Sequence, residues 1–288
     1  MQVIIINVFL PAFMIFGNCY VGNACRKEEE FKVKRLWIPI IVMYLMCLGL
    51  SIACAAELHP KYGPKAMPLI RDNQYFRGAA AKDFWSLIPF YAPQTNEYSC
   101  SVASVAIVFN AMAKRRDGIP DTEMNITQDM LLDSVKDVPI RALVSKEGFW
   151  GRHGLTLEEL RIVTEQAART LGFQAIVTAY SFKNRSLDEL RAILRSNEDD
   201  SMDFLMAHFI QDDLTGAQGG PYAHISPIGA YDGKSRRVLI LDVDRDWYSP
   251  YWVQDEDLLA AMNHETKPLG SGGFVRVRFE AGIQNILK

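Results

Sequence analysis

An uninterrupted apolar stretch near the amino terminus, residues 36–56, constrains this 288-residue chain most, because it separates a membrane-directed segment from the remainder. Basic residues precede the stretch, and Ala53 and Ala55 at its end match the A-x-A pattern of a signal-peptidase site. We therefore expect residues 32–56 to be a signal peptide or a membrane anchor. A core helix of a soluble protein is the disfavoured alternative, because such helices are seldom so uniformly apolar. Cys54 also gives a weak match to a lipoprotein signal.

A second apolar run lies further upstream, at about residues 3–21. Residues 1–31 are therefore either an extension from a misplaced start codon or an extra membrane segment. The linker of residues 26–35 carries five basic residues, and the positive-inside rule predicts that it stays cytoplasmic. The chain after residue 56 is then exported, and is either periplasmic or anchored to the inner membrane facing the periplasm.

The cysteines are distributed unevenly between these two parts. Four of the five lie in the amino-terminal segments, and Cys100 is the remaining one. The exported part therefore cannot form an internal disulfide. Because a lone thiol is a liability in an oxidising compartment unless it is buried or used, Cys100 is a candidate functional residue.

The sequence around Cys100 predicts a loop that becomes a helix. A polar run from Gln94 to Ser99 follows Pro93, and residues 102–112 are small or apolar, as in a buried helix. Cys100 would then lie at a helix amino terminus, where free N–H groups and the helix dipole favour a thiolate. A thiolate is the nucleophilic form of cysteine. The alternative is that Cys100 is a small hydrophobic residue on a core helix.

The order of the predicted elements indicates an α+β domain at residues 80–282, after an irregular lead-in at residues 57–79. Helices are expected first, at 127–135, 156–171 and 186–195, the last two opening with the capping boxes Thr156/Glu159 and Ser186/Glu189. Strands dominate later, at 173–180, 203–209, 224–231, 238–243 and 273–279. The net charge of −3, with no basic stripe, excludes a nucleic-acid partner.

Two further residues complete a catalytic pattern. His224 begins one strand of a predicted hairpin and Asp242 ends the other, so the hairpin brings them together at one sheet edge. A carboxylate beside a histidine fixes its tautomer and stabilises the imidazolium. Papain-like peptidases use the same chain order, cysteine, histidine and then acid. Alternatively, His224 is a core histidine and Asp242 caps a turn.

Several blocks of the sequence resemble the phytochelatin synthase family, a papain-like group of enzymes acting on γ-glutamyl peptides. The matching blocks are Gln94-x5-Cys100, Val102-Ala-Ser104, Asn110, Gly154-Leu-Thr-Leu, His224-Ile-Ser-Pro-Ile-Gly-Ala-Tyr231, Leu239-Ile-Leu-Asp-Val-x-Arg245, Tyr248-x-Pro-x-Trp-Val253, Ala261-Met262 and Gly273-Phe274. The resemblance implies a papain-like fold, in which a helical half carrying Cys100 packs on an antiparallel sheet carrying His224 and Asp242.

The resemblance also implies an activity: cleavage of the Cys–Gly bond of glutathione through a γ-glutamylcysteinyl thioester, followed by hydrolysis or by transfer to a second glutathione, which makes phytochelatin. Cys100 would be the nucleophile, His224 the general base and acid, and Asp242 the orienting acid. Gln94 would donate to the oxyanion together with the backbone N–H of Cys100. The residues expected to bind substrate are Arg245, Ser226 and Tyr248.

The same resemblance gives expectations about cofactors and partners. No cofactor is expected to be tightly bound, and heavy-metal ions such as Cd, Zn and Cu would act as glutathione thiolates. No protein metal site is expected, because the histidines are scattered along the chain. The expected partners are glutathione and metal–glutathione complexes, with membrane contact through the amino-terminal segment alone; a homodimer is compatible with the family.

Departures from the family pattern concern the acyl acceptor more than the first chemical step. Ser101 follows the nucleophile where the family usually has glycine, Pro221-Tyr222 adds bulk before His224, Trp247 replaces a basic residue, and Gly272 replaces an arginine. Two other functions remain open at this point. One is an exported papain-like processing peptidase, and the other is a non-catalytic module that binds glutathione or metal thiolates.

Overall fold

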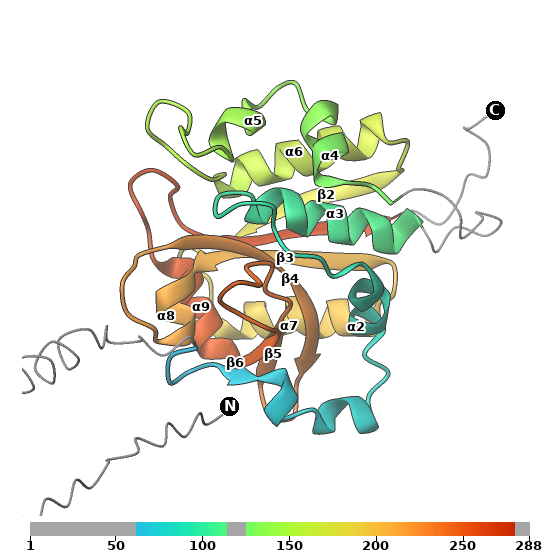
Figure 1. Ribbon diagram of the computed structural model, residues 1–288. Helices are drawn as coiled ribbons and strands as arrows, with labels where there is room; N and C mark the ends of the chain where they lie inside the picture. The colour runs from blue at the N-terminus through green and yellow to red at the C-terminus, as the bar shows by residue number, and fades with distance from the viewer. Residues whose placement is uncertain (1–61, 114–124, 280–288) are drawn as a thin grey trace, which may run out of the picture. The chain divides into compact units, whose positions relative to one another are not determined.

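The computed structural model describes residues 62–113 and 125–279, all of which belong to one unit of the chain, His59–Lys288. Figure 1 shows the arrangement of its elements. In chain order the elements are β1 (Met67–Pro68), η1 (Leu69–Arg71), η2 (Gln74–Arg77), α2 (Lys82–Leu87), η3 (Ile88–Phe90), α3 (Cys100–Ala113), α4 (Gln128–Ser134), α5 (Ile140–Leu143), α6 (Leu157–Thr170), β2 (Ala175–Ser181), α7 (Leu187–Asp199), β3 (Asp203–Ile210), α8 (Gln211–Thr215), β4 (Ala223–Asp232), β5 (Arg237–Ile240), β6 (Tyr251–Gln254), α9 (Asp255–Asn263) and β7 (Gly273–Phe279).

A seven-stranded antiparallel sheet organises the domain, with strand order β1-β6-β5-β4-β3-β7-β2. Strands β3 and β4 lie near its centre and are almost entirely buried. Helices precede the strand-rich half along the chain, so the α+β class predicted from the sequence is confirmed.

Helices cover both faces of the sheet. One apolar cluster joins α3 and α6 to residues of β3 and β7 such as Phe204, Met206 and Val275. The other joins α7, α8 and α9 to the alternate residues of the same strands, such as Leu205, Ala207 and Phe274. This alternation is what a strand buried on both faces requires, because successive side chains point to opposite sides. Figure 1 shows α3–α6 above strand β3 and α7–α9 below that strand.

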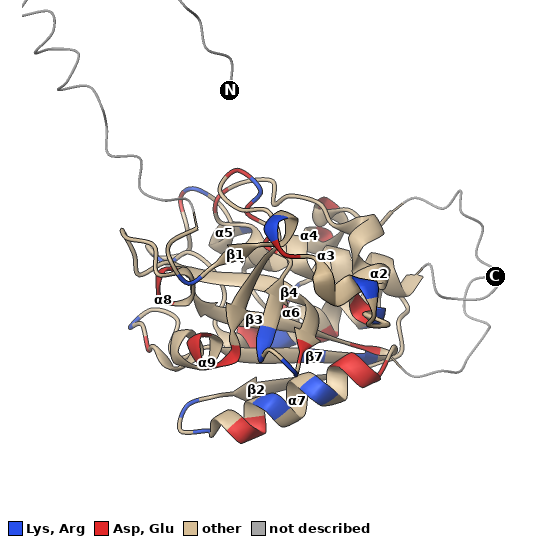
Figure 2. Ribbon diagram, turned by 90° about the horizontal axis from the view of Figure 1, so that it is seen from below, with Lys and Arg blue, Asp and Glu red and all other residues tan. Residues whose placement is uncertain are grey.

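The capping boxes in the sequence correctly predicted where α6 and α7 begin. Thr156 and Ser186 each accept a hydrogen bond from the backbone N–H three residues later, and both capping boxes are closed by their glutamates. Helix α7 carries acidic and basic residues along its length (Figure 2), of which Asp188, Glu189 and Arg195 are exposed. By contrast, α3 is buried from Cys100 to Met112, as expected for a helix that is apolar on all sides.

The lead-in at residues 57–79 was predicted to be irregular, but part of it forms a short strand and two 3-10 helices. Strand β1 pairs antiparallel with β6, and η1 and η2 follow it directly. Tyr75 and Phe76 of η2 pack against Trp252 of β6, with ring centroids 5.6 and 6.0 Å away. The short strand was missed because its two residues carry no periodicity, and a partner distant in sequence supplies its pairing.

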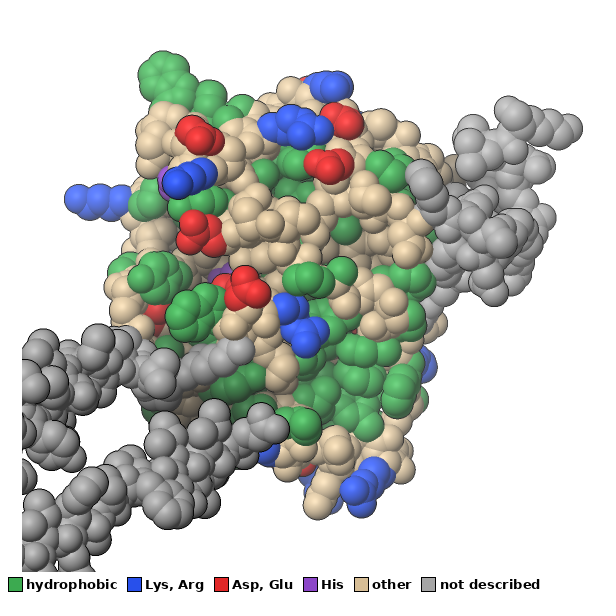
Figure 3. All heavy atoms as spheres, viewed as in Figure 1, with side chains coloured by type: hydrophobic (Ala, Val, Ile, Leu, Met, Phe, Trp, Pro, Cys, Tyr) green, Lys and Arg blue, Asp and Glu red, His purple; other side chains and the backbone are tan. Residues whose placement is uncertain are grey.

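Apolar side chains are exposed in this first part of the domain. Met67, Ile70 and Trp85 are 44%, 86% and 56% exposed. In the view of Figure 3, hydrophobic side chains gather at the lower right of the described part, while charged side chains are scattered over the rest of the visible surface. Among the described residues no helix is long and apolar enough to span a membrane. The apolar runs predicted at residues 1–31 and 32–56 lie outside the described residues.

Candidate active site

Cys100 is the first residue of α3, as predicted, and is 7% exposed. The preceding loop is a tight polar turn, in which the Ser99 hydroxyl accepts hydrogen bonds from the backbone N–H groups of Thr95 and Asn96, both at 3.1 Å. Because Ser99 is itself buried, this turn holds the start of the helix in one place. The thiol therefore lies at the helix end where backbone N–H groups are unpaired.

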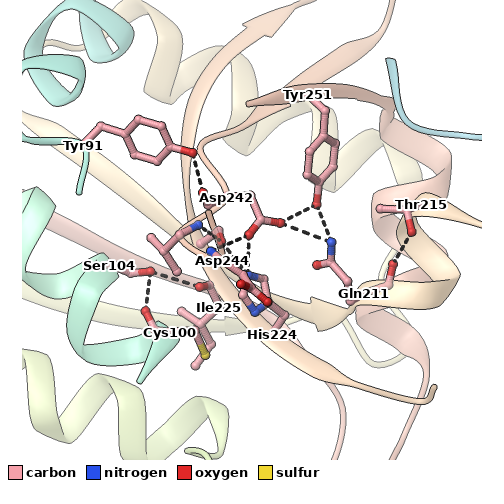
Figure 4. Close-up of polar contacts among 12 residues, drawn as sticks. Tyr91, Cys100, Ser104, Gln211, Thr215, His224, Ile225, Asp242, Asp244 and Tyr251 are labelled. Atoms are coloured by element: carbon pink, nitrogen blue, oxygen red, sulfur yellow. Dashed lines mark hydrogen bonds and ion pairs between the residues drawn. The ribbon is translucent and has the colours of Figure 1, made fainter. Parts of the chain in front are cut away.

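Ser104 fixes the first turn of α3 to strand β4. Its hydroxyl lies 2.8 Å from the carbonyl oxygen of Cys100 and 3.0 Å from that of Ile225 (Figure 4). Ile225 directly follows His224, so one side chain connects the backbones of the two candidate catalytic residues. In the sequence Ser104 was one letter of a matched block, and nothing in its neighbours indicated this contact.

His224 and Asp242 meet as the hairpin predicted. The imidazole Nε2 lies 2.9 Å from Asp242 Oδ1, and the two residues are 9% and 0% exposed. The Ser226 hydroxyl lies 3.0 Å from the same nitrogen, and the Phe209 ring contacts the imidazole edge to face, with centroids 5.7 Å apart. These contacts fix the ring plane. Since Nε2 is occupied, Nδ1 is the nitrogen that remains for the Cys100 side, where Figure 4 shows the sulfur.

The Asp242 carboxylate is surrounded by donors. Besides His224, it accepts from the backbone N–H of Asp244 at 2.9 Å, from Gln211 Nε2 at 3.2 Å and from the Tyr251 hydroxyl at 3.0 Å. Gln211 also donates to the Tyr251 hydroxyl at 3.0 Å. A fully buried carboxylate needs such partners, because an unpaired buried charge is costly. Sequence reasoning missed both donors: Gln211 lies 31 residues before Asp242, and Tyr251 lies on the next strand, β6.

These neighbours determine the protonation of His224. Burial by itself would lower the pKa of His224, but the Asp242 carboxylate and the Cys100 side chain together raise that pKa well above its ordinary value of 6.5. The imidazole is therefore held in its charged form near neutral pH. A charged imidazole next to a cysteine is the arrangement used by cysteine hydrolases and acyltransferases.

The candidate catalytic residues lie within a segment that matches a known protein family. The sequence model described as phytochelatin synthase matches residues 70–271. The chain belongs to the phytochelatin synthase family. The resemblance noted in the sequence is thereby confirmed, and the match includes Cys100, His224 and Asp242.

Two curated plant proteins of this family are similar to the chain. The protein called glutathione gamma-glutamylcysteinyltransferase 1 from Triticum aestivum is 25% identical over 213 residues, which cover 73% of this chain and 39% of that protein. The protein of the same name from Lotus japonicus is 24% identical over 199 residues, which cover 68% of this chain and 36% of that protein. The chain thus spans well under half the length of these relatives.

Two other residues of the family pattern lie beside Asp242. The backbone N–H of Gln94 donates to the carbonyl of Val243 at 2.9 Å, and its side-chain oxygen is buried without a hydrogen-bond partner among the described residues. The exposed guanidinium of Arg245 stacks over the ring of Tyr91 at 4.6 Å, and the Tyr91 hydroxyl donates to the carbonyl of Asp242. Both residues therefore lie in the loops that surround the candidate catalytic group.

Ser226, predicted to bind substrate, has a different place in the structure. It is fully buried, and its hydroxyl is shared between His224 and the backbone N–H of Val243, at 3.0 and 3.4 Å. No surface of Ser226 is open to a bound molecule. The substrate-binding assignment is wrong, because the side chain lies beneath the imidazole and orients it.

Tyr248, also predicted to bind substrate, is partly buried among other tyrosines. Its ring packs against Tyr62 and Tyr251, with centroids 5.7 and 5.6 Å away. Its hydroxyl interacts with Gln211 and Thr215, which Figure 4 shows opposite Cys100. Tyr248 therefore supports the residues that hold Asp242, and its direct contact with substrate stays a prediction.

No three histidine, cysteine or acidic side chains of the described ranges are grouped so that they could hold a metal ion. His153 stacks on Tyr98, and His264 lies beside Asp213. His208 is buried in β3, with neither ring nitrogen hydrogen-bonded to any described residue. His59 lies outside the described residues.

Proposed function

We propose that the protein is a papain-like acyltransferase that removes glycine from glutathione. The observation that carries the proposal is the meeting of Cys100 with the hydrogen-bonded pair His224 and Asp242 in a chain of the phytochelatin synthase family. The names of the two plant relatives support the choice of a γ-glutamylcysteinyl group as the transferred acyl group.

In the first step the Cys100 thiolate attacks the carbonyl of the Cys–Gly bond. The negative charge on the carbonyl oxygen would be stabilised by the backbone N–H of Cys100 and by the side-chain amide of Gln94. The His224 imidazolium then gives its proton to the departing glycine amine. A γ-glutamylcysteinyl thioester on Cys100 and a neutral His224 remain.

In the second step neutral His224 takes a proton from the acceptor. Water as acceptor releases γ-glutamylcysteine, whereas the amine of a second glutathione gives a phytochelatin. We propose that hydrolysis predominates and that transfer is the weaker reaction. Cd, Zn and Cu ions would enter as thiolates of glutathione, with no tightly bound cofactor, so the partners are glutathione and its metal complexes; a homodimer is compatible with this reaction.

We also propose that the reaction takes place outside the cytoplasm. The apolar segment at 32–56, with its basic flank, supports export as a periplasmic or membrane-anchored protein. Residues 1–31 would then be an upstream extension or a further membrane segment, and residues 80–282 the catalytic domain. Arg245 is the residue of this domain proposed to bind a substrate carboxylate, since its guanidinium is exposed beside the site.

The test is glycine release by the purified full-length protein incubated with glutathione, with and without cadmium, followed by mass analysis of the products. Cys100→Ala should abolish release, and Cys54→Ala, which removes another thiol of the chain, should leave it unchanged. Unchanged release by Cys100→Ala would refute the proposed nucleophile.

The same assay separates the two alternative functions. A processing peptidase would cleave peptides that lack a γ-glutamyl linkage, so such a peptide is included as a second substrate. A non-catalytic module would bind glutathione, measured by calorimetry, without releasing glycine. Either result would refute the proposed activity.

A further inference from the structure

The loop that follows β5 carries a second carboxylate next to the catalytic group. Asp244 donates its backbone N–H to Asp242 Oδ1 at 2.9 Å, and its side chain is half-buried. The carboxylate is close enough to His224 for the two groups to act on each other's protonation. In Figure 4 Asp244 lies on the same side of Asp242 as Cys100 and His224, whereas Gln211 and Tyr251 lie on the opposite side.

Among the described residues, the imidazole of His224 is the one positive group that lowers the pKa of Asp244. No lysine or arginine of the described part of the chain forms an ion pair with it, and the neighbouring guanidinium of Arg245 stacks on Tyr91 instead. Its side chain accepts a hydrogen bond from the backbone N–H of Asp246. Burial, with the nearby Asp242 and Asp246 charges, raises the pKa of Asp244, while His224 acts in the opposite direction. Such a carboxylate gains free energy when a bound molecule supplies a positive charge.

The position beside His224 is the position that the acyl acceptor must approach. In the proposed reaction His224 protonates the departing glycine and then takes a proton from the incoming acceptor. The two nitrogens therefore pass the same face of the imidazole, because the second step is chemically the reverse of the first. An amino acid or peptide acceptor arrives as an ammonium ion, which cannot attack until it loses a proton.

We propose that Asp244 binds the ammonium group of the acyl acceptor and so favours transfer to an amine over hydrolysis. This inference rests on the proposed function and names the residue that selects its second substrate. One ammonium proton passes to the Asp244 carboxylate, and the free amine attacks the thioester carbonyl. A C–N bond forms and the C–S bond breaks, which returns the Cys100 thiolate. His224 takes the second proton and becomes the imidazolium, and Asp244 then releases its proton to solvent.

The test measures how the acyl-enzyme divides between acceptors. The full-length protein and the variants Asp244→Asn and Asp246→Asn are incubated with glutathione, and the ratio of phytochelatin to γ-glutamylcysteine is measured by mass spectrometry. This ratio does not depend on how much acyl-enzyme forms, so a variant that is partly unfolded still reports it. Asp246→Asn is the matched control, since Asp246 lies on the same loop and its exposed, solvent-screened charge acts on Asp244 more weakly than His224 and Asp242 do. Hydroxylamine, which is uncharged at neutral pH, serves as a second acceptor and gives a hydroxamate.

Asp244→Asn should lower the ratio for glutathione about tenfold or more, the effect of losing a hydrogen bond between charged groups. The ratio of hydroxamate to γ-glutamylcysteine should stay unchanged, and Asp246→Asn should behave like wild type with both acceptors. The inference would be overturned if the glutathione ratio were unchanged in Asp244→Asn, or if that variant lost as much of the hydroxamate ratio as of the glutathione ratio. It would also be overturned if Asp246→Asn lowered the glutathione ratio equally, or if the wild-type protein hydrolysed the acyl-enzyme without any transfer. A wild-type protein that releases no glycine would instead refute the proposed function, and the inference with it.

Discussion

His208 should make the domain sensitive to mild acid. It lies in the central strand β3 between Ile225 of β4 and Gly273 of β7, and neither ring nitrogen has a hydrogen-bond partner among the described residues. Burial, together with the charge of His224, lowers the pKa of His208 from 6.5 to about 4. The folded protein therefore holds this histidine neutral, whereas the unfolded chain accepts a proton at higher pH.

The size of the effect follows from linkage. The difference between 6.5 and about 4 corresponds to about 3 kcal/mol of the free energy of unfolding. Because the folded pKa is the lower one, this stability is present above pH 6.5 and is lost as the pH falls toward 4. In His208→Leu the loss should disappear. At pH 7 the variant should be as stable as wild type or more so, since two unpaired buried nitrogens are removed.

The assay is urea unfolding at several pH values between 7 and 4.5, followed by the fluorescence of buried Trp252. The measured quantity is the difference in unfolding free energy between His208→Leu and wild type, which should grow by about 2 kcal/mol or more over this range in favour of the variant. Met206→Leu, on the same strand and face, controls for repacking and should show no pH-dependent difference. Parallel pH curves for His208→Leu and wild type would refute the reasoning.

Three further predictions concern the catalytic group and the residue that joins α3 to β4. Asp242→Asn should slow glycine release by about a thousandfold, because an amide neither fixes the His224 tautomer nor supports its charge; a loss below about tenfold would leave Asp242 a structural part alone. In wild type the alkaline limb of the kcat/KM profile should lie well above pH 6.5, because activity needs the imidazolium and the pKa of His224 is raised; a limb at or below 6.5 would contradict this. Ser104→Ala should cost about 1–2 kcal/mol of stability in urea unfolding by removing the hydroxyl shared by Cys100 and Ile225, and it should lower kcat, whereas Ser86→Ala on the exposed face of α2 should change neither.

Local sequence signals were sufficient for the parts of the site that depend on neighbours in the chain. A polar turn before an apolar segment placed Cys100 at the start of α3, and this prediction is confirmed. The hairpin of β4 and β5 brought His224 to Asp242, because antiparallel strands joined by a short turn must align their ends. The capping boxes of α6 and α7 were likewise predictable, because each depends on a pattern of four consecutive residues.

Contacts between distant segments were beyond the reach of such patterns. Gln211 lies on a short helix that was not predicted, and no residue near it in the sequence indicated that it would donate to Asp242. Ser226 was assigned to substrate from its place in a matched block, yet it is fully buried and its hydroxyl lies against His224.

The sequence by itself determined the α+β class, the start of α3 at Cys100 and the pairing of His224 with Asp242, because each follows from local backbone preference or from strand alternation. The tertiary structure alone decided how Ser104 joins α3 to β4, how Gln211 reaches Asp242 and how Asp244 comes to lie near His224. The reason is physical: hydrogen bonding and burial of a side chain depend on elements that the fold brings together from far along the chain, and no short stretch of sequence contains both partners.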